Sequence, residues 1–216
     1  MSSHGTTGKR PYAPRMAPEE RREQLLDAAL EIINTDGVAA VSVDAVAKAV
    51  GVTRPVVYGQ FTDANHILRV LLRRESERAL AQLADTLPDD LVDADPVETF
   101  TQVADGFFAA IVAAPQRWRS ILLPVDATPP PVRKAQQRGD ALVRERFAEI
   151  TRWFLASRAD SEQIDVDLLA HLLLTFMQEG GRLLLRDPET YPPERLTAMA
   201  RFMVENFFNA PPQASS

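Results

Sequence analysis

Cysteine is absent from the 216-residue sequence and histidine is scarce. The lack of cysteine excludes a disulfide framework, thiolate metal sites and a cysteine nucleophile, and it suits a reducing compartment. The three histidines (His4, His66 and His171) are far apart in the sequence, which disfavours a histidine-rich zinc site. We therefore expect a fold that needs neither disulfides nor a metal.

Long apolar runs are also missing. The longest, 168–177, is interrupted by His171 and is far shorter than the roughly 20 residues that a membrane span needs. The first 16 residues are polar and contain no apolar segment, so they lack the pattern of a secretory signal. These features predict a soluble protein of the cytoplasm.

Sequence motifs of enzymes are missing too. Neither Gly-x-Ser-x-Gly nor Gly-x-Gly-x-x-Gly occurs in the sequence. The acidic residues between 89 and 95 lack the glycine and the spacing of a calcium loop, and a solvated linker explains them better. We predict no enzyme activity, no metal and no cofactor.

The negative charge is unevenly distributed along the chain. The net charge is −6, from 24 basic and 30 acidic residues, yet basic and acidic residues balance up to residue 70. The whole deficit lies in the remainder of the chain. A neutral front end can therefore meet DNA phosphates while the acidic rear stays clear of them.

Glycine is scarce, apolar residues make up 45% of the chain, and no strand-like alternation stands out, so we predict an all-α protein. Proline and acid clusters divide the rear of the chain. The expected helices are 18–36, 43–50, 53–60, 63–83, 96–114, 115–123, 130–158, 165–186 and 193–209. The expected domains are a flexible basic tail (1–17), a DNA-binding domain (18–66), a larger helical domain (67–210) and a second tail (211–216).

Two short helices separated by a glycine turn form a helix-turn-helix candidate. Ser42 is expected to cap the first, Gly51-Val52 makes the turn, and Thr53 is expected to cap the second. Gly37 would end the preceding long helix in the left-handed conformation. In such a pair the first helix braces the second, which can enter the major groove of DNA.

The residues of this region resemble the TetR family of bacterial transcriptional regulators. The resemblance rests on Leu25-Leu26-Asp27-Ala28-Ala29, Gly37, Val41 to Ala47, Ala49 to Thr53 and Val57-Tyr58-Gly59-Gln60-Phe61, and it covers residues 20–72 closely. It implies a three-helix DNA-binding headpiece whose third helix reads bases. It also implies a fourth helix leading to a larger domain, about nine helices in all, which dimerises and binds a small effector.

The resemblance also implies which residues contact DNA. Arg54, Pro55, Val56 and Gly59 would face the bases, and Arg54 could pair with guanine N7 and O6. The alternative for Arg54 is a phosphate contact alone. The full set of predicted DNA-binding residues is Ser42, Lys48, Thr53, Arg54, Pro55, Val56, Tyr58, Gly59 and Gln60.

The sequence departs from the family where a lysine often grips phosphate near the start of the fourth helix. This chain has Asp63-Ala64-Asn65 there, and Gln60 where the family often has histidine. Basic residues of the tail, together with Arg21 and Arg22, could compensate by reaching the DNA backbone or minor groove. A solvated tail without DNA contacts is the alternative.

The rear domain is rich in aromatic residues, which predicts an apolar or aromatic effector, although each single residue could simply be part of the core. The expected polar anchors are Arg119, His171 and Gln178, with packing in the core as the alternative for His171. The complete predicted effector set is Phe107, Ile111, Trp118, Arg119, Trp153, His171, Phe176 and Gln178.

The last two expected helices suggest self-association. Gly180 and Gly181 lie inside a helix, where each costs roughly 1 kcal/mol relative to alanine, so close approach of another helix could explain them. The apolar residues Leu196, Met199, Met203 and Phe207 would complete a dimer interface. The alternative is a core within one chain.

Together these features predict a homodimeric, ligand-responsive transcriptional regulator. We expect a repressor that binds a near-palindromic operator in double-stranded DNA and is released by a small apolar or aromatic effector. The alternative is a helical protein-interaction module that has lost sequence-specific DNA binding.

Overall fold

The computed structural model describes residues 16–84, 94–123, 144–145, 147–156, 162 and 164–209. Every regular element among them is a helix, which confirms the predicted all-α class. The elements are α1 (Pro18–Asp36), η1 (Val38–Ala40), α2 (Val43–Val50), α3 (Arg54–Tyr58), α4 (Ala64–Ala84), α5 (Pro96–Ala113), α6 (Pro115–Leu122), a helical stretch over 147–155, α8 (Val166–Arg186) and α9 (Pro193–Asn209). The predicted tails fall almost wholly outside the described residues, and so does 124–143.

The N-terminal part, called the headpiece from here on, comprises α1, α2, α3 and the first turns of α4 around one apolar core. Apolar residues at helical spacing on α1 and α4 face each other there, and α2 and α3 close the end. Burial of this face is the main stabilising term for helices as short as α2 and α3. The fully buried members are Leu25, Leu26, Ala29, Val46, Val57, Phe61, Ile67 and Leu71.

Local signals set most of the headpiece boundaries. The Ser42 hydroxyl accepts a hydrogen bond from the Ala45 N–H at 3.0 Å, and Gly51 ends α2 in the left-handed conformation at φ 73°. The expectation for Gly37 was wrong in part: its φ is +84°, but its ψ of 166° is extended. The third helix ends at Tyr58, two residues earlier than predicted, because the N–H groups of Gln60 and Phe61 both turn back to the Val57 carbonyl.

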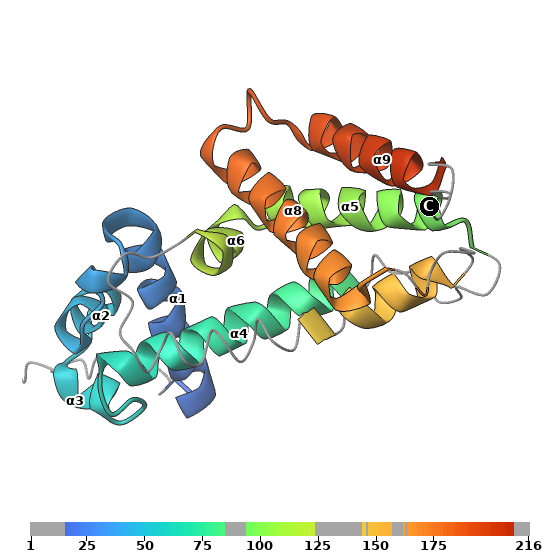
Figure 1. Ribbon diagram of the computed structural model, residues 1–216. Coiled ribbons are helices and arrows are strands. Elements are labelled where there is room, and N and C mark those ends of the chain that lie inside the picture. The colour runs from blue at the N-terminus through green and yellow to red at the C-terminus, as the bar shows by residue number, and fades with distance from the viewer. Residues whose placement is uncertain are drawn as a thin grey trace, which may run out of the picture.

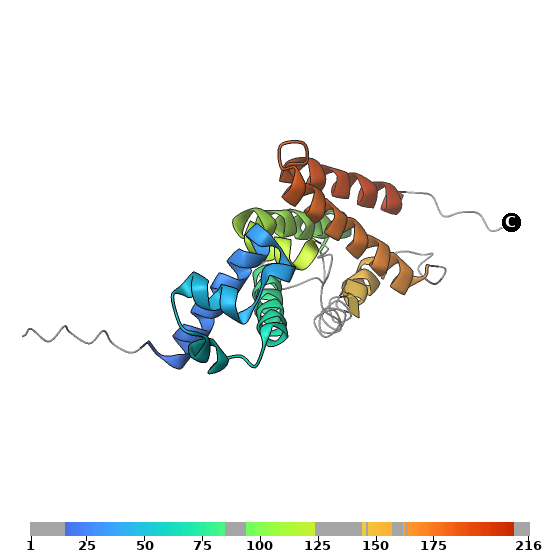
Figure 2. The same ribbon diagram turned by 90° about the vertical axis from the view of Figure 1, so that its left-hand side faces the viewer.

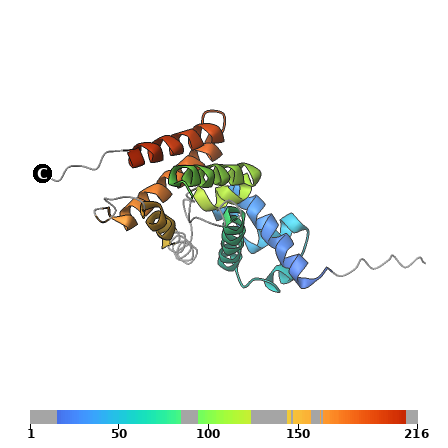
Figure 3. The same cartoon turned by 90° about the vertical axis from the view of Figure 1, so that its right-hand side faces the viewer.

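The rear domain packs α5, α6, α8 and α9 around a second core. Helix α9 lies along α5, and α8 crosses them, while α4 runs from the headpiece to this domain (Figures 1 and 3). Figure 2 shows the molecule from the headpiece side, with α8 and α9 above and to the right of α1 and α2. Aromatic side chains dominate this core, including a T-shaped contact of Phe107 with Trp118 at 5.2 Å between ring centroids.

Gly180 and Gly181 are buried within the chain rather than facing a second copy. A Cβ added to Gly180 would lie 2.9 Å from the ring of Phe108, and one added to Gly181 would lie 2.7 Å from the Leu122 side chain. Leu196 is also buried against this core. For these three residues the intramolecular alternative describes the structure, because α8 needs the glycines to approach α5 and α6.

A buried ion-pair network joins the headpiece to the rear domain. Glu75 of α4, only 1% exposed, accepts hydrogen bonds from Arg74 Nε at 2.8 Å and from Arg117 Nε of α6 at 3.1 Å. Arg74 reaches on to Glu23 and Asp27 of α1, each at 2.9 Å. The charges that link α1, α4 and α6 therefore meet around a single carboxylate.

The network continues into α5. Arg117 donates a hydrogen bond to the Gln82 side chain at 3.0 Å, and Gln82 donates one to the Ala110 carbonyl at 3.2 Å. A second link between the two parts runs from Asn34 of α1 to the Gln116 carbonyl at 3.3 Å. The headpiece is thus held against α6 as well as being continuous with α4.

Length and hydropathy give no described helix that alone would cross a bilayer. Only α5 and α6 taken together pass that test, as a pair bent by 109°.

Candidate nucleic-acid interface

Helix α3 is anchored on one side and free on the other. Val57 is fully buried, and Phe61, just after the helix, is 1% exposed, so both fix α3 to the headpiece core. Tyr58 is 57% exposed and Val56 38% exposed. The helix lies at the end of the molecule farthest from α9, where its outer side faces solvent (Figure 1). This is the geometry that a groove-reading helix requires.

The predicted DNA-binding residues are spread from Ser42, just before α2, to Gln60, two residues after the end of α3. All are exposed except Gln60, which is half-buried. Thr53 occupies the N-cap position of α3 with extended backbone, but its side chain makes no capping hydrogen bond, so that part of the prediction was wrong. Ser42, by contrast, caps α2 as expected.

Arg54 forms an ion pair that the sequence analysis missed. Its Nε and Nη2 atoms contact the two carboxylate oxygens of Asp44, which lies in the first turn of α2. Both side chains are exposed. The ten-residue separation crosses the Gly51 turn, so helix periodicity alone could not have indicated the contact. Between residues 42 and 60 the charged side chains are Asp44, Lys48 and Arg54, which leaves a net charge of +1.

Arg22 of α1 contacts the segment that follows α3. It donates a hydrogen bond to the Gln60 carbonyl at 3.0 Å and lies 4.8 Å from the centroid of the Phe61 ring. Arg21 donates a hydrogen bond to Gln24 at 2.6 Å. Arg22 thus holds the segment after α3 to α1, and its contact with DNA stays a prediction. The basic residues of the tail lie outside the described residues.

Polar side chains form hydrogen bonds with backbone N–H groups at the N-terminus of α4. Asp63 accepts a hydrogen bond from the His66 N–H at 2.7 Å, and this bond holds the pKa of the Asp63 carboxyl below its ordinary value. His66 Nδ1 in turn accepts a hydrogen bond from the Thr62 N–H at 3.2 Å. These bonds satisfy backbone groups at the helix start and fix the position of α4 beside α3.

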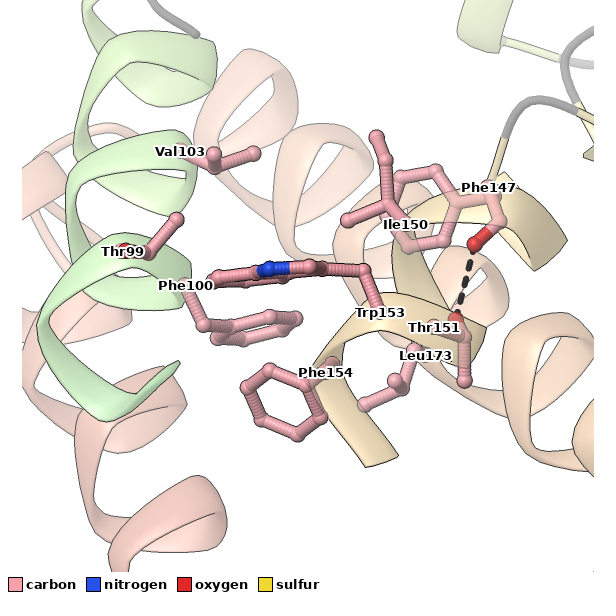
Figure 4. A pocket seen from close by; sticks show the side chains of 9 residues that line it. All are labelled: Thr99, Phe100, Val103, Phe147, Ile150, Thr151, Trp153, Phe154 and Leu173. Atoms are coloured by element: carbon pink, nitrogen blue, oxygen red, sulfur yellow. Dashed lines mark hydrogen bonds between the residues drawn. The ribbon is translucent and has the colours of Figure 1, made fainter. Parts of the chain in front are cut away.

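The rear domain has a small pocket between α5, the 147–155 stretch and α8. Figure 4 shows the rings of Phe100, Trp153 and Phe154 gathered in it, with Leu173 approaching from α8. Its volume is about 20 Å³, close to the space of one water molecule. Ligand pockets commonly measure roughly 300–1,000 Å³. An effector would therefore have to widen the pocket.

The predicted effector residues do not gather in one place. Phe107, Ile111 and Trp118 are buried in the core between α5 and α6, and the Trp118 indole N–H has no hydrogen-bond partner among the described residues. Of the set, only Trp153 lines the pocket. His171 is exposed on α8, so the alternative of packing in the core was wrong for it.

The remaining members of that set lie around the rim of the core. Arg119 is exposed, and its Nη2 donates a hydrogen bond to the Leu185 carbonyl at 3.4 Å. Phe176 and Gln178 are half-buried on α8. Phe100, Val103, Ile150 and Leu173, which the sequence analysis did not select, line the pocket instead. Phe100 belongs to the rear-domain aromatic residues that suggested an apolar ligand, whereas Val103, Ile150 and Leu173 suit a core as well as a pocket and carry no such signal.

One side of α9 is apolar and exposed. Met199 and Met203 are 50% and 41% exposed, and Phe202 beside them is 59% exposed. On α8, Leu168 and Leu172 are also more than half exposed. The side chain of Phe207 lies outside the described residues. Exposed large apolar side chains of this kind mark surfaces suited to burial by another chain.

Comparison with known proteins agrees with this organisation. Residues 25–70 match the sequence model described as "Bacterial regulatory proteins, tetR family". An uncharacterised HTH-type transcriptional regulator of Mycobacterium tuberculosis is 25% identical over 162 residues, and the match spans 75% of this chain and 57% of that protein. The HTH-type transcriptional regulator SrpR of Pseudomonas putida is 39% identical over 54 residues, a quarter of each chain.

Solved structures show the same fold along most of the chain. A TetR-like transcriptional regulator from a Rhodococcus species superposes with a TM-score of 0.72 at 18% identity, covering 91% of this chain and all of that one. The transcriptional regulator FadR from Bacillus subtilis, solved in complex with stearoyl-CoA, has a TM-score of 0.69 at 18% identity, covering 88% and 98%. The chain thus resembles the tetR family of bacterial regulatory proteins in sequence over residues 25–70, and it shares its helical fold with TetR-like regulators along most of its length.

Proposed function

We propose that this protein is a transcriptional regulator that reads DNA with α3. The observation that carries the proposal is the contrast within α3: Val57 is fully buried, while Arg54, Pro55, Val56 and Tyr58 are exposed. A helix held in this way can enter the major groove without distortion of the headpiece. Lys48 and the exposed Ser42 hydroxyl flank it on α2.

The protein acts as a homodimer in this proposal. Two α3 helices must reach half-sites about one turn of DNA apart, roughly 34 Å, which one chain cannot do alone. The exposed apolar side of α9 around Met199 and Met203, with Leu172 of α8, supplies a surface for the second copy. A two-fold axis there predicts a near-palindromic operator. Because the partner is chromosomal DNA, the protein works in the cytoplasm.

A small apolar or aromatic effector controls DNA binding in this proposal. The aromatic lining of the pocket around Phe100 and Trp153 supports an apolar ligand. The Trp118 N–H in the adjoining core has no partner within the described parts of the chain and offers a donor to a polar group. The structural neighbour FadR was solved with stearoyl-CoA, a ligand with a long apolar chain.

The route from effector to DNA is the network around Glu75. A ligand that widens the rear domain displaces α6, and Arg117 on α6 holds the same carboxylate as Arg74, which contacts α1. We propose a repressor whose effector favours a dimer with headpieces wrongly spaced for DNA. To change operator occupancy from 99:1 to 1:99, the effector must prefer that state by about 10⁴-fold.

Fluorescence anisotropy with labelled duplex fragments of the source genome, including the protein's own promoter, tests DNA reading. We expect one or a few fragments to bind far more tightly than random duplex. We also expect affinity to fall steeply with salt, since phosphate contacts release counterions. Equal binding to all fragments, or a flat salt response, would instead support the protein-interaction module.

Two headpiece variants sharpen the test. Arg54→Ala should weaken the preferred fragment more than random duplex, whereas Tyr58→Phe should weaken both by a similar factor. If Arg54→Ala lowers the affinity for the preferred fragment and for random duplex by the same factor, Arg54 does not read a base.

A further inference from the structure

Arg54 and Asp44 meet edge to edge on the surface that α2 and α3 share. Nε and Nη2 of Arg54 contact Oδ1 and Oδ2 of Asp44, so the carboxylate binds one edge of the guanidinium through two parallel contacts. The two side chains remain 66% and 56% exposed, which leaves the other edge of the guanidinium open to solvent.

The donors that remain on Arg54 have a defined geometry. A guanidinium carries five N–H donors in a planar fork, and Asp44 uses two of them. The three that remain include a parallel pair at the outer end, one on Nη1 and one on Nη2. This pair matches the two adjacent acceptors, N7 and O6, that guanine presents in the major groove.

Asp44 is itself well placed to hold the guanidinium. It lies in the first turn of α2, where the helix dipole favours an acidic side chain. The helix is fixed by the Ser42 cap and by buried Val46 and Ala47. The negative charge of Asp44 also repels nearby DNA phosphates, and this repulsion weakens sequence-independent binding to DNA.

We propose that Asp44 is a positioning residue that directs Arg54 end-on toward a guanine in each half-site. This inference rests on the proposed function of the headpiece and adds to it a named base and a second residue. Asp44 contacts no base. It acts through Arg54, raising the ratio of sequence-specific to random DNA binding.

The test uses the full-length chain and duplexes selected from a randomised library by the unsubstituted protein. Anisotropy then measures three probes: the best selected duplex, the same duplex with its most strongly selected guanine replaced by 7-deazaguanine, and a random duplex. The 7-deaza base lacks the N7 acceptor and keeps its Watson–Crick pairing, so it isolates the major-groove contact.

The unsubstituted protein should lose about tenfold in affinity on the 7-deaza duplex. Asp44→Asn should bind random duplex more tightly, lose most of its sensitivity to the 7-deaza base and show a specificity ratio lowered by about tenfold. Asp44→Glu keeps the charge but alters the reach, so it should retain weak random binding while losing sensitivity to the 7-deaza base. Arg54→Lys should lose that sensitivity as well, because an ammonium cannot make the two-pronged contact.

Glu31→Gln is the matched control. Glu31 is an exposed acid of α1 with no ion pair among the described residues, and its removal changes the net charge of the chain as Asp44→Asn does. The control should leave the specificity ratio and the 7-deaza sensitivity unchanged. Circular dichroism of each variant verifies that the helices are intact, as expected for exposed sites.

The opposite result for Asp44→Asn overturns the inference. If that variant keeps the 7-deaza sensitivity, or gains more affinity for the selected duplex than for random duplex, Asp44 competes with DNA for Arg54 rather than orienting it. If the unsubstituted protein selects sequences without any guanine that responds to the 7-deaza base, the inference fails and the proposed function stands. If it selects no sequence at all, both fail.

Discussion

The headpiece and the rear domain are both helices around an apolar core, but they differ in what fixes their details. In the headpiece, local signals such as the Ser42 cap and the Gly51 turn determine where helices begin and end. In the rear domain, contacts between distant residues decide the arrangement, as where Gly181 accommodates Leu122 and Ile111. Between the two parts lies the buried network around Glu75. The comparison predicts that substitutions have the largest effects where distant parts of the chain meet.

The largest effect is expected at Glu75. Glu75→Ala removes a carboxylate that is 1% exposed and leaves the buried Arg74 guanidinium with less compensation. Breaking a buried pair from one side commonly costs about 3–5 kcal/mol, and urea unfolding followed by circular dichroism measures it. Glu77→Ala, on the exposed side of the same helix, is the control, since its pair with Arg73 is open to solvent and worth less than about 1 kcal/mol. Equal losses in both variants would show that the Glu75 network does not hold the two parts together.

The next largest effect is expected at Gly181. Gly181→Ala puts a methyl group 2.7–2.8 Å from the side chains of Leu122 and Ile111, so the core must shift at a cost of about 1–3 kcal/mol. The headpiece counterpart, Gly59→Ala, meets only atoms at 3.4–3.5 Å in an ordinary helical conformation and should leave thermal stability almost unchanged. A Gly181 variant as stable as the original would mean that α8 can move away from α5 and α6 easily.

A smaller effect on stability is expected at the N-cap positions of α2 and α3. Ser42→Ala removes a hydrogen bond to the Ala45 N–H and should lower the free energy of unfolding by about 1 kcal/mol. Thr53→Ala removes no capping hydrogen bond and should cost distinctly less in the same measurement. Equal losses would indicate that Thr53 caps α3 in solution.

The smallest effect is expected from the dependence of stability on pH. It can be compared for one carboxyl in the headpiece and one in the rear domain. The His66 N–H holds the pKa of Asp63 below its ordinary value of 3.8, and hydrogen bonds from Thr190 do the same for Asp187. A carboxyl with a lowered folded-state pKa stabilises the protein above its ordinary pKa, and that stabilisation is lost as the pH falls through the folded value. The difference in stability between the original protein and Asp63→Asn or Asp187→Asn should therefore shrink between pH 6 and pH 2. A constant difference over that range would mean that the hydrogen bonds do not depend on ionisation.

The sequence could predict the parts of this fold that depend on neighbouring residues. The bounds of α2 follow from Ser42 and Gly51, and α5 and α9 begin where proline and acid clusters end. The short η1 element was missed because three residues carry no periodic pattern. The shorter α3 reflects backbone hydrogen bonds to Val57 that no side chain signals.

The candidate sites show the same limit. The exposed residues of α3 were predictable, since a single buried position between them fixes which side faces out. The pair between Asp44 and Arg54 was not, because it depends on how α2 and α3 are set against each other across the turn. In the rear domain, Phe107 and Trp118 look the same in sequence as pocket aromatics, and only packing decides that they belong to the core.

The charge network around Glu75 has a consequence for engineering. Sensor proteins are often assembled by joining the DNA-binding part of one regulator to the ligand-binding part of another. In this chain such a graft at the middle of α4 would take Glu23 of α1 and Arg117 of α6, which the Arg74–Glu75 pair connects, from different proteins. A working chimera must therefore take Glu75 and Arg117 from the same protein as α1. The segment to be transferred is larger than the DNA-reading helices, because it extends to α6.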